Sequence, residues 1–416
     1  MRRFISIFST PAARSSAIYY FGNFLLGSGR YLFHLVLLRL LLPSEYGEFL
    51  AYLSLMYLLG IPNGTINTIV TKYVSEFKGK NQERTINHFF YYFLGKITPY
   101  SLLMGVLLIF ASRPLAVIFR AHQGAFVILG LSLFLNFAGT LIRGYLNAFQ
   151  RFVAGIGVGV VEAILTIALA ALFISARLSA TGAVLAQLVA SLIGILMTLF
   201  LIRKAVYPKA GGKPETFKLS GFTGYSLIFA LGTTSLISSD VLLVRYFFSE
   251  HLSGIYASLS VLGRMVYFGL GPLISLVLPV AAHRQAATKT ARSVFLKLGG
   301  IVMLFGLAGT SVFVIFPGLI VSLFSGANYA QAAAFLPLFA VSMLLFSLNL
   351  FALSYLMAIG QPQANRYFLL AALAQPLLIS LFHQDISQVV WINLTVESFL
   401  FIPLLGEVKA SIYNRS

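Results

Sequence analysis

The sequence predicts an all-α polytopic membrane protein with about 12 transmembrane helices, and three observations support this fold class. Of the 416 residues, 59% are hydrophobic and only 10% are charged, whereas a soluble domain has about 25% charged residues. Apolar runs recur along the whole chain, most of them with the roughly 20 residues that a helix needs to cross a bilayer. The long segments of alternating polarity that a transmembrane β-barrel requires do not occur.

The apolar runs define the predicted spans, and a basic stretch over residues 203–218 divides them into two sets of six. The last two runs are the shortest. The predicted spans are residues 17–42, 49–71, 89–110, 125–149, 153–174, 182–202, 221–248, 255–280, 294–316, 332–359, 367–382 and 389–405.

The charges in the loops predict how the chain is oriented. In this topology most Lys and Arg residues fall on one side of the membrane, and the other side carries mainly Arg113, Arg120 and Arg177. Because cytoplasmic loops are enriched in Lys and Arg, we expect a multi-pass protein of the cytoplasmic membrane with both termini in the cytoplasm. The net charge of +18 then reflects topology and not a nucleic-acid partner.

The basic N-terminal segment precedes no clean apolar core with a cleavage site, so we expect no cleaved signal peptide.

Matching motifs at a nearly constant offset predict an internal repeat. Gly47 after the first span matches Gly254 after the seventh, an offset of 207 residues (254 − 47). Tyr145 near the end of the fourth span matches Tyr355 near the end of the tenth, an offset of 210 residues (355 − 145). An even number of spans separates the matched elements, so the halves keep the same orientation across the membrane. We therefore expect two six-helix lobes, 1–202 and 219–416, around a central cavity, joined by a basic cytoplasmic linker over 203–218.

Polar side chains follow single helical faces inside several predicted spans. A charged side chain costs free energy at bilayer depth, so each one indicates either a functional site or a structural ion pair. Arginine is also the side chain best suited to binding phosphate. The residues concerned are Asn23, Arg30 and His34 on the first span, Asn136, Arg143 and Asn147 on the fourth, and Arg264 and Tyr267 on the eighth.

Three carboxylates also lie inside predicted spans: Glu162, Asp240 and Glu397. Their number equals that of the three buried arginines, so three structural ion pairs would satisfy all six groups. The sequence leaves this structural alternative open beside a functional one. Two further arginines, Arg39 and Arg245, lie near span ends, where long cationic side chains are expected to snorkel to the interface.

Several stretches resemble a known family. The string TSLISSDVLLVRYFFSEHLSGIYASLSVLGR is similar to the start of the second half of oligosaccharide flippases of the polysaccharide-biosynthesis family, within the multidrug/oligosaccharidyl-lipid/polysaccharide (MOP) exporter superfamily. LRLLLPSEYGEFLAYLSL resembles the corresponding turn of the first half, and LIRGYLNAFQRF the end of its fourth span. The resemblance covers nearly the whole chain. It implies two six-helix lobes that face each other, and transport of polyprenyl-pyrophosphate-linked sugars by alternating access.

The resemblance also implies roles for the polar residues inside the spans. The expected partners are the lipid-linked oligosaccharide, membrane lipids, and a polysaccharide polymerase with its assembly proteins. Glu162, Asp240 and Glu397 are candidates for coupling transport to a proton or sodium gradient. The arginines Arg30, Arg143 and Arg264 would hold the pyrophosphate, and the sugar would be bound by the polar residues on the same faces, Asn23, His34, Asn136, Asn147 and Tyr267.

Two alternatives remain open at this point. A cation-coupled multidrug exporter of the same superfamily would require a cavity rich in carboxylates or one in which the arginines are neutralised. A membrane-embedded sugar polymerase or ligase would require large outward loops and a catalytic constellation. The sequence shows no nucleophile–base set, metal-ligand cluster or Gly-rich phosphate loop, and it contains no cysteine. We therefore expect no enzyme, no cofactor and no metal site.

Overall fold

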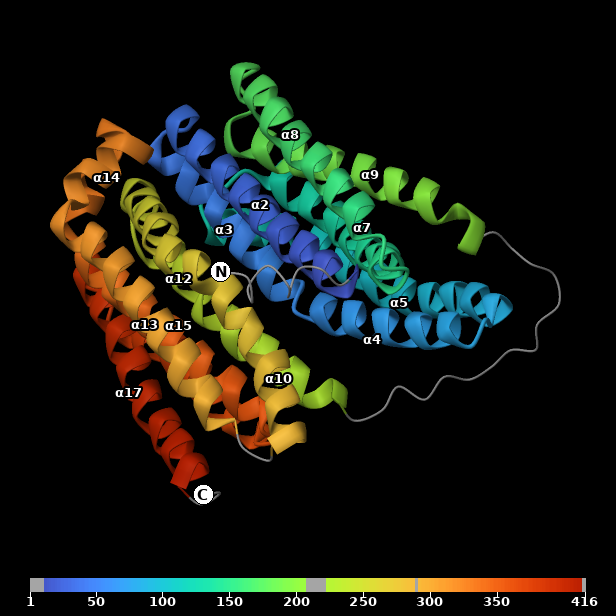
Figure 1. Cartoon of the computed structure of the whole chain (residues 1–416). Helices are drawn as coiled ribbons and strands as arrows, with labels where there is room; N and C mark the ends of the chain where they lie inside the picture. Colours follow the sequence, from blue (N-terminus) through green and yellow to red (C-terminus); the bar gives the residue numbers. More distant parts are fainter. Residues whose placement is uncertain (1–10, 207–221, 289–290, 414–416) are drawn as a thin grey trace. The chain divides into compact units, whose positions relative to one another are not determined.

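The computed structural model describes residues 11–206, 222–288 and 291–413, and every regular element in these ranges is helical (Figure 1). The chain divides into two compact units. Unit 1 comprises Met1–Leu40 and Leu59–Thr223, and unit 2 comprises Leu41–Leu58 and Gly224–Ser416. Most of the predicted linker, residues 207–218, lies outside the described residues.

The helices have the length and apolarity of membrane spans. Within the described ranges, nine helices pass this test singly, and two pairs of helices that are each interrupted by a short break raise the number to 11. The interrupted pairs occupy the second and seventh predicted spans. The first predicted span corresponds to α2 (Pro11–Leu40), a helix that carries three arginines and is not among the 11. The protein is therefore an all-α multi-pass membrane protein.

Unit 1 is built around α7, which packs against α4, α5 and α9, while α8 packs against α2 and α9. The helix α7 is central because one side of it is almost continuously apolar and buried, from Ala125 to Ala148. Besides α2, the helices of unit 1 are α4 (Pro62–Gly79), α5 (Glu83–Phe110), α6 (Ser112–Ile118), α7 (Gln123–Ala148), α8 (Phe152–Ser175) and α9 (Ser179–Val206).

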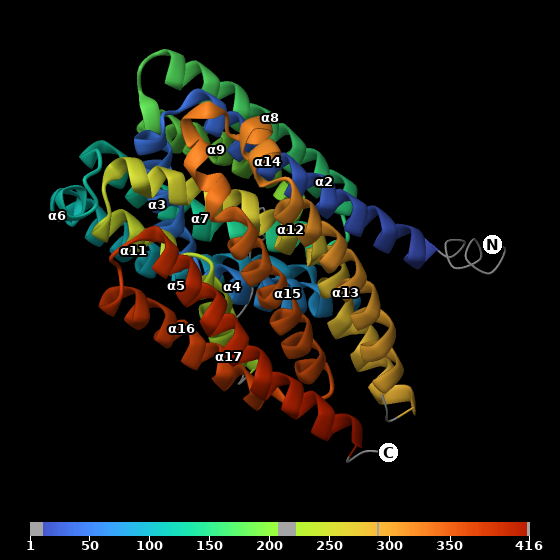
Figure 2. The ribbon, with the colours of Figure 1, turned by 90° about the vertical axis from the view of Figure 1, so that its left-hand side faces the viewer.

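Unit 2 has the same plan, with α15 at its centre against α12, α13 and α17 (Figure 2). A broken span, α10–α11, bends by 41° and packs through α11 against α12 and α16. The helices of unit 2 are α3 (Pro43–Leu59), α10 (Phe222–Leu236), α11 (Ser239–Phe247), α12 (Glu250–Thr288), α13 (Arg292–Ile315), α14 (Pro317–Phe324), η2 (Ala327–Ala334), α15 (Leu336–Ala358), η3 (Pro362–Ala364), α16 (Asn365–Leu381) and α17 (Ile386–Tyr413).

The central helices of the two units end in the same way. After α7, the backbone amide of Arg151 donates to the carbonyl oxygen of Leu146. Gln150, which directly precedes Arg151, has φ of 55°. After α15, the amide of Gln361 donates to Leu356, and the intervening Gly360 has φ of 82°. Both endings are Schellman-type caps with a left-handed residue. The superposition of residues 1–202 on 219–410 stays a prediction.

The short helix α3 belongs to unit 2 although its neighbours in the chain belong to unit 1. A break at Gly60, followed by Pro62 at the start of α4, separates α3 from α4. Proline suits the first turn of a new helix because it has no amide hydrogen to leave unsatisfied there. The predicted lobe boundaries do not anticipate this assignment of residues 41–58 to the second unit.

Glycine allows α3 to approach α12 at backbone distance. A Cβ atom at Gly254 would overlap the carbonyl oxygen of Pro43, and one at Gly47 would lie 2.7 Å from the amide nitrogen of Gly254. The Oη of Tyr329 in η2 donates to the carbonyl oxygen of Leu41 at 3.0 Å. Burial raises the pKa of Tyr329, with a further contribution from the charge of Glu45, so the hydroxyl stays a neutral donor.

Arg245, at the C-terminal end of α11, also binds α3. Its Nη1 donates to the carbonyl oxygen of Ser44 and to Oγ of Ser253, both at 3.1 Å, and the side chain is only 1% exposed. The expectation that Arg245 snorkels to the interface is therefore wrong. The carbonyl oxygens and hydroxyls of two helix ends replace the water that a snorkelling arginine would reach.

Candidate functional site

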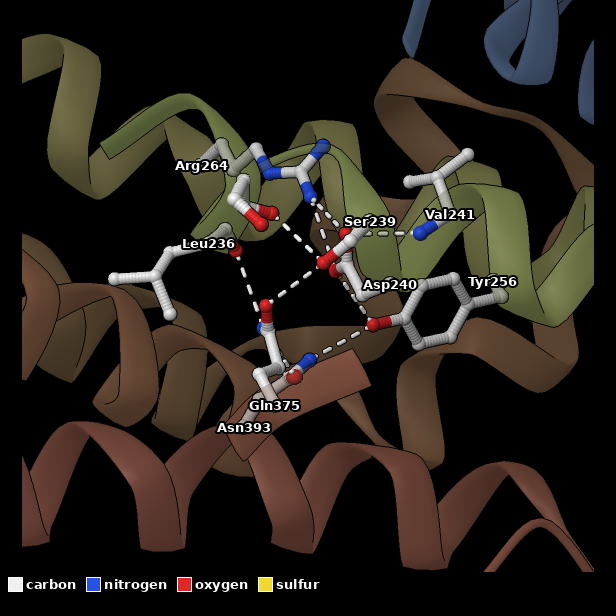
Figure 3. A network of polar contacts seen from close by, with 9 residues as sticks. Leu236, Ser239, Asp240, Val241, Tyr256, Arg264, Gln375 and Asn393 are labelled. Carbon is white, nitrogen blue, oxygen red and sulfur yellow. Dashed lines mark hydrogen bonds and ion pairs between the residues drawn. The ribbon is translucent and has the colours of Figure 1, made fainter. Parts of the chain in front are cut away.

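A buried ion pair in unit 2 forms the centre of the polar network in Figure 3. One terminal nitrogen of Arg264, on α12, donates to both carboxylate oxygens of Asp240, on α11, at 3.0 Å each. The side chains are 8% and 2% exposed. Further hydrogen bonds to the remaining polar atoms help to offset the cost of removing such a pair from water.

Local structure explains why Asp240 occupies this position. The break between α10 and α11 places Asp240 in the first turn of α11, where the positive end of the helix dipole favours a carboxylate. The amide of Val241 donates to its Oδ1 at 2.8 Å. On α12, Tyr256 and Arg264 are eight residues apart and therefore share one helical face. Both side chains can then reach the same carboxylate.

The network extends from Asp240 to α16 and α17 through neutral groups (Figure 3). The Oη of Tyr256 donates to Oδ2 of Asp240 at 2.7 Å and accepts from the amide of Asn393 at 2.8 Å. The amide of Gln375 donates to Oδ1 of Asn393 at 2.8 Å, and Oγ of Ser239 donates to Oε1 of Gln375 at 3.0 Å. This chain of donors and acceptors ties the broken span to three other helices.

Sequence reasoning missed the neutral members of this network. Gln375 on α16 and Asn393 on α17 each lie between apolar neighbours in the sequence, and both are 2% exposed. A lone amide in such a span is a signal for an interhelical hydrogen bond. Tyr256 has no such signal, because tyrosine is common at many positions in these spans. One donor of the centre is left over: within the described ranges, Nε of Arg264 is buried and has no hydrogen-bond partner.

A second ion pair lies in unit 1, between α7 and α8. One terminal nitrogen of Arg143 donates to Oε1 and Oε2 of Glu162 at 2.9 and 2.7 Å. The helix α9 passes close to this pair at Gly194, where a Cβ atom would lie 3.1 Å from Oε2 of Glu162. The pair is more accessible than that of unit 2, because the side chain of Arg143 is 35% exposed and that of Glu162 is 20% exposed.

The third carboxylate has a different partner. Glu397 on α17 is 2% exposed and accepts from the side-chain amide of Asn349 on α15 at 2.8 Å. The same amide donates to the backbone carbonyl oxygen of Glu397 at 2.9 Å. Across the described part of the chain, no Lys, Arg or His forms an ion pair with Glu397. Two of the three ion pairs that the sequence left open therefore form, and Glu397 uses an amide instead.

The other proposed binding residues are distributed over the two units. In unit 1, Arg30 is exposed and, among the described residues, has no ion pair or hydrogen bond, while His34 is half-buried beside the rings of Tyr31 and Phe33. The side chain of Asn23 lies outside what the structure describes. Asn136 is exposed and its Oδ1 accepts from Asn63 at 2.7 Å, Asn147 is half-buried, and Tyr267 of unit 2 packs edge-on against Phe346 with ring centroids 5.0 Å apart.

The polar residues form one centre within unit 1 and one within unit 2. The structure brings Arg143 to Glu162 and Arg264 to Asp240, and it leaves Arg30 as an exposed cation on α2. The site assignments themselves stay predictions. Each centre contains an arginine, so an anionic ligand could compete with the carboxylate for the guanidinium group.

Comparisons with known proteins agree with the membrane architecture. A family model described as polysaccharide biosynthesis protein matches residues 36–334. No curated protein sequence matches the chain. Among solved structures, the chain is similar to the inward-facing conformation of a multidrug resistance MATE family transporter of the MOP superfamily, with 13% identity and a TM-score of 0.71. That similarity covers 93% of this chain and 94% of the other.

Two further solved structures show the same fold. Lipid II flippase MurJ in an inward closed conformation matches with 13% identity and a TM-score of 0.73, over 94% of this chain and 87% of that chain. MATE in a bent conformation matches with 14% identity and a TM-score of 0.63, over 96% and 95%. At these identities the similarity establishes the fold alone.

Proposed function

Because the chain belongs to the polysaccharide biosynthesis protein family, we propose that it flips a polyprenyl-pyrophosphate-linked oligosaccharide across the cytoplasmic membrane by alternating access. The observation that carries this proposal is the family match, which extends over residues 36–334 and so includes helices of both units. The fold, which resembles that of MOP transporters, supports it.

The chemistry of the substrate fits the exposed cations of unit 1. A lipid-linked oligosaccharide has an anionic pyrophosphate, a polar sugar and an apolar tail. Arg30 has no competing ion pair among the described residues, and Arg143 is partly exposed, so these two can bind phosphate at the lowest cost. Arg264 would have to release Asp240 first, since its side chain is only 8% exposed. We assign the sugar hydroxyls to Asn136 and Asn147 on the same helix as Arg143.

The coupling ion is proposed to act at Glu397. The charges of Asp240 and Glu162 are already offset by arginines, whereas Glu397 has only an amide partner in the described ranges. A carboxyl group without a counter-ion at membrane depth is the group most sensitive to an arriving cation. The proposed partners are the lipid-linked oligosaccharide, membrane lipids and the polymerase and assembly proteins of the same polysaccharide.

A specific observation also favours the drug-exporter alternative. Two of the three arginines that would bind pyrophosphate are neutralised by carboxylates in their own unit. A neutralised centre attracts anions less than a bare cation does. The exporter alternative would therefore gain if Arg30 proved dispensable for flipping.

Reconstitution in proteoliposomes tests the proposed function. The substrate is a lipid-linked oligosaccharide with a fluorescent sugar, and an impermeant glycosidase reports how much of it faces outward. Protein-containing vesicles should expose nearly all of the label, and empty vesicles only the outer-leaflet half. Transport of a cationic dye without sugar flipping would establish the exporter alternative, and lengthening of the sugar chain on a gel would establish a polymerase.

A further inference from the structure

A cationic pocket lies within unit 1, and neither Arg143 nor Glu162 lines it. It forms where the end of α4, the start of α5, the α7–α8 turn and the last turn of α9 meet, and its volume is about 780 Å³. The end of α9 is held there by α5, because Oη of Tyr91 donates to the carbonyl oxygen of Val206 at 2.9 Å. By the loop charges, this end of the unit is the one predicted to face the cytoplasm.

The lining of the pocket is strongly basic. Four cationic side chains, Lys78, Arg151, Arg203 and Lys204, contribute to it, and Glu83 is the one carboxylate among its lining residues. Like charges so close together repel one another unless an anion lies between them. The excess of positive charge therefore favours an anionic ligand.

Two of the four cations hold the pocket together. Nζ of Lys78 donates to the carbonyl oxygen of Phe149 at 3.2 Å, and Nη1 of Arg151 donates to that of Leu201 at 2.9 Å. Phe149 is the residue that caps α7, and Leu201 lies within α9, so these bonds fix the α7–α8 turn against α4 and α9. In the described part of the chain, Arg203 and Lys204 make no hydrogen bond or ion pair. Their N–H groups are available to a ligand.

Apolar surface adjoins these two available cations. The guanidinium of Arg203 lies 3.8 Å from the ring centroid of Phe200, whose side chain is 64% exposed. One turn earlier, Leu196 is 56% exposed. Leu196, Phe200 and Arg203 are spaced at i, i+4 and i+7 and share one face of α9. That face changes from apolar to cationic along its length. It therefore complements an anionic phospholipid, which has apolar acyl chains and a negatively charged phosphate.

We propose that this pocket binds the phosphate of an anionic phospholipid headgroup, with the acyl chains against Phe200 and Leu196. Basic pockets between transmembrane helices on the cytoplasmic side bind such headgroups because each cation near the surface adds favourable energy. Arg203 and Lys204 supply the charge-assisted hydrogen bonds. The site is independent of the proposed transport function, since it uses none of the residues assigned to the sugar substrate.

Native mass spectrometry of the full-length protein in detergent tests the proposal. The protein is titrated with cardiolipin, phosphatidylglycerol, phosphatidylcholine and inorganic pyrophosphate. Cardiolipin and phosphatidylglycerol should bind more tightly than phosphatidylcholine. The double variant Arg203→Gln/Lys204→Gln should bind them about 25-fold more weakly, from about fivefold per cation. The matched control is Arg84→Gln/Lys80→Gln, which removes the same charge at the α4–α5 turn outside the pocket lining and should bind as the wild type does.

Three results would overturn the proposal. Unchanged affinity in the Arg203→Gln/Lys204→Gln variant would show that the pocket cations do not hold the lipid. An equal loss of lipid affinity in the control variant would show that binding depends on the overall charge of the protein and not on the pocket. Displacement of lipid by micromolar pyrophosphate would identify a site for soluble diphosphates. If the double variant melts below the wild type, the single variant Lys204→Gln decides, with an expected loss of about fivefold.

Discussion

The guanidinium of Arg264 and the carboxylate of Asp240 face each other inside unit 2, with one nitrogen 3.0 Å from both oxygens. Tyr256 and the amide of Val241 also donate to this carboxylate. The acceptor is thus well satisfied, whereas Nε of Arg264 has no partner among the described residues. Such a pair is costly to break and gives little net stability relative to an apolar pair.

We predict strong, non-additive effects of substitutions in this pair. Asp240→Leu and Arg264→Met should each destabilise unit 2 by about 3–5 kcal/mol, because each leaves the opposite buried charge unpaired. The double variant Asp240→Leu/Arg264→Met should recover most of that loss, since both charges are then removed. Thermal melting in detergent, combined as a double-mutant cycle, measures the coupling. Additive losses would show that the two side chains do not depend on each other.

A second prediction concerns the backbone contact between α3 and α12. Gly254→Ala should destabilise the docking of α3 by about 1–3 kcal/mol, because the new methyl group meets the rigid carbonyl group of Pro43. The control is Gly271→Ala in the same helix, where a Cβ atom meets nothing within 4 Å. Since alanine is the better helix former, the control should keep or raise the melting temperature.

Limited proteolysis at the ends of α3 supplies the second measurement for this prediction. Gly254→Ala should accelerate cleavage there, and Gly271→Ala should not. If both variants melt and are cleaved like the wild type, α3 does not need the close approach at Gly254.

The sequence predicts much of this fold because apolar run lengths and helix-end residues are local signals. Its motif match of Gly47 with Gly254 predicts equivalent positions after two spans, but it does not predict that these glycines contact each other. The reason is that a repeat specifies equivalence and not proximity. The same limit explains why the sequence does not predict the burial of Arg245. Burial of a cation near a span end depends on carbonyl oxygens that another helix supplies.

The candidate site shows a similar limit. Polar spacing on a single helix identifies Arg264 and Arg143, since both lie on faces with other polar residues. It does not predict which carboxylate each one binds, because that choice depends on helix packing. The three-pair hypothesis holds for Glu162 and Asp240, whereas Glu397 is satisfied by Asn349 from α15. The amide of Asn349 donates hydrogen bonds to both the side chain and the backbone of Glu397, but it supplies no positive charge.

A third prediction tests Glu397 as the coupling group. Glu397→Gln keeps the shape and an oxygen acceptor for Asn349, so it should melt within about 1 kcal/mol of the wild type. Flipping driven by a pH or sodium gradient should fall at least tenfold, whereas downhill exchange without a gradient should persist. The control is Glu407→Gln, which removes a half-buried carboxylate that pairs with the exposed Arg366 at 3.2 Å. Gradient-driven flipping at the wild-type rate in Glu397→Gln would exclude this residue from coupling.

The last prediction concerns Arg30 as the phosphate-binding residue of α2. Arg30 is exposed, and no ion pair or hydrogen bond holds it within the described ranges. Arg30→Gln should therefore change the stability by no more than about 0.5 kcal/mol. Flipping of the lipid-linked oligosaccharide should fall at least tenfold, because one charge-assisted contact to the pyrophosphate is lost. Arg30→Lys should restore flipping only in part, since a point charge cannot reproduce a planar two-pronged contact.

Two comparisons make the Arg30 result decisive. Arg113→Gln removes an exposed cation elsewhere in unit 1 and should flip substrate at the wild-type rate. Arg143→Gln should lose both flipping and some stability, because Glu162 is left without its partner. A stable Arg30→Gln protein that flips normally would remove Arg30 from the binding site. Of the three arginines proposed to bind pyrophosphate, Arg143 and Arg264 are already paired with carboxylates. That result would therefore favour the drug-exporter alternative.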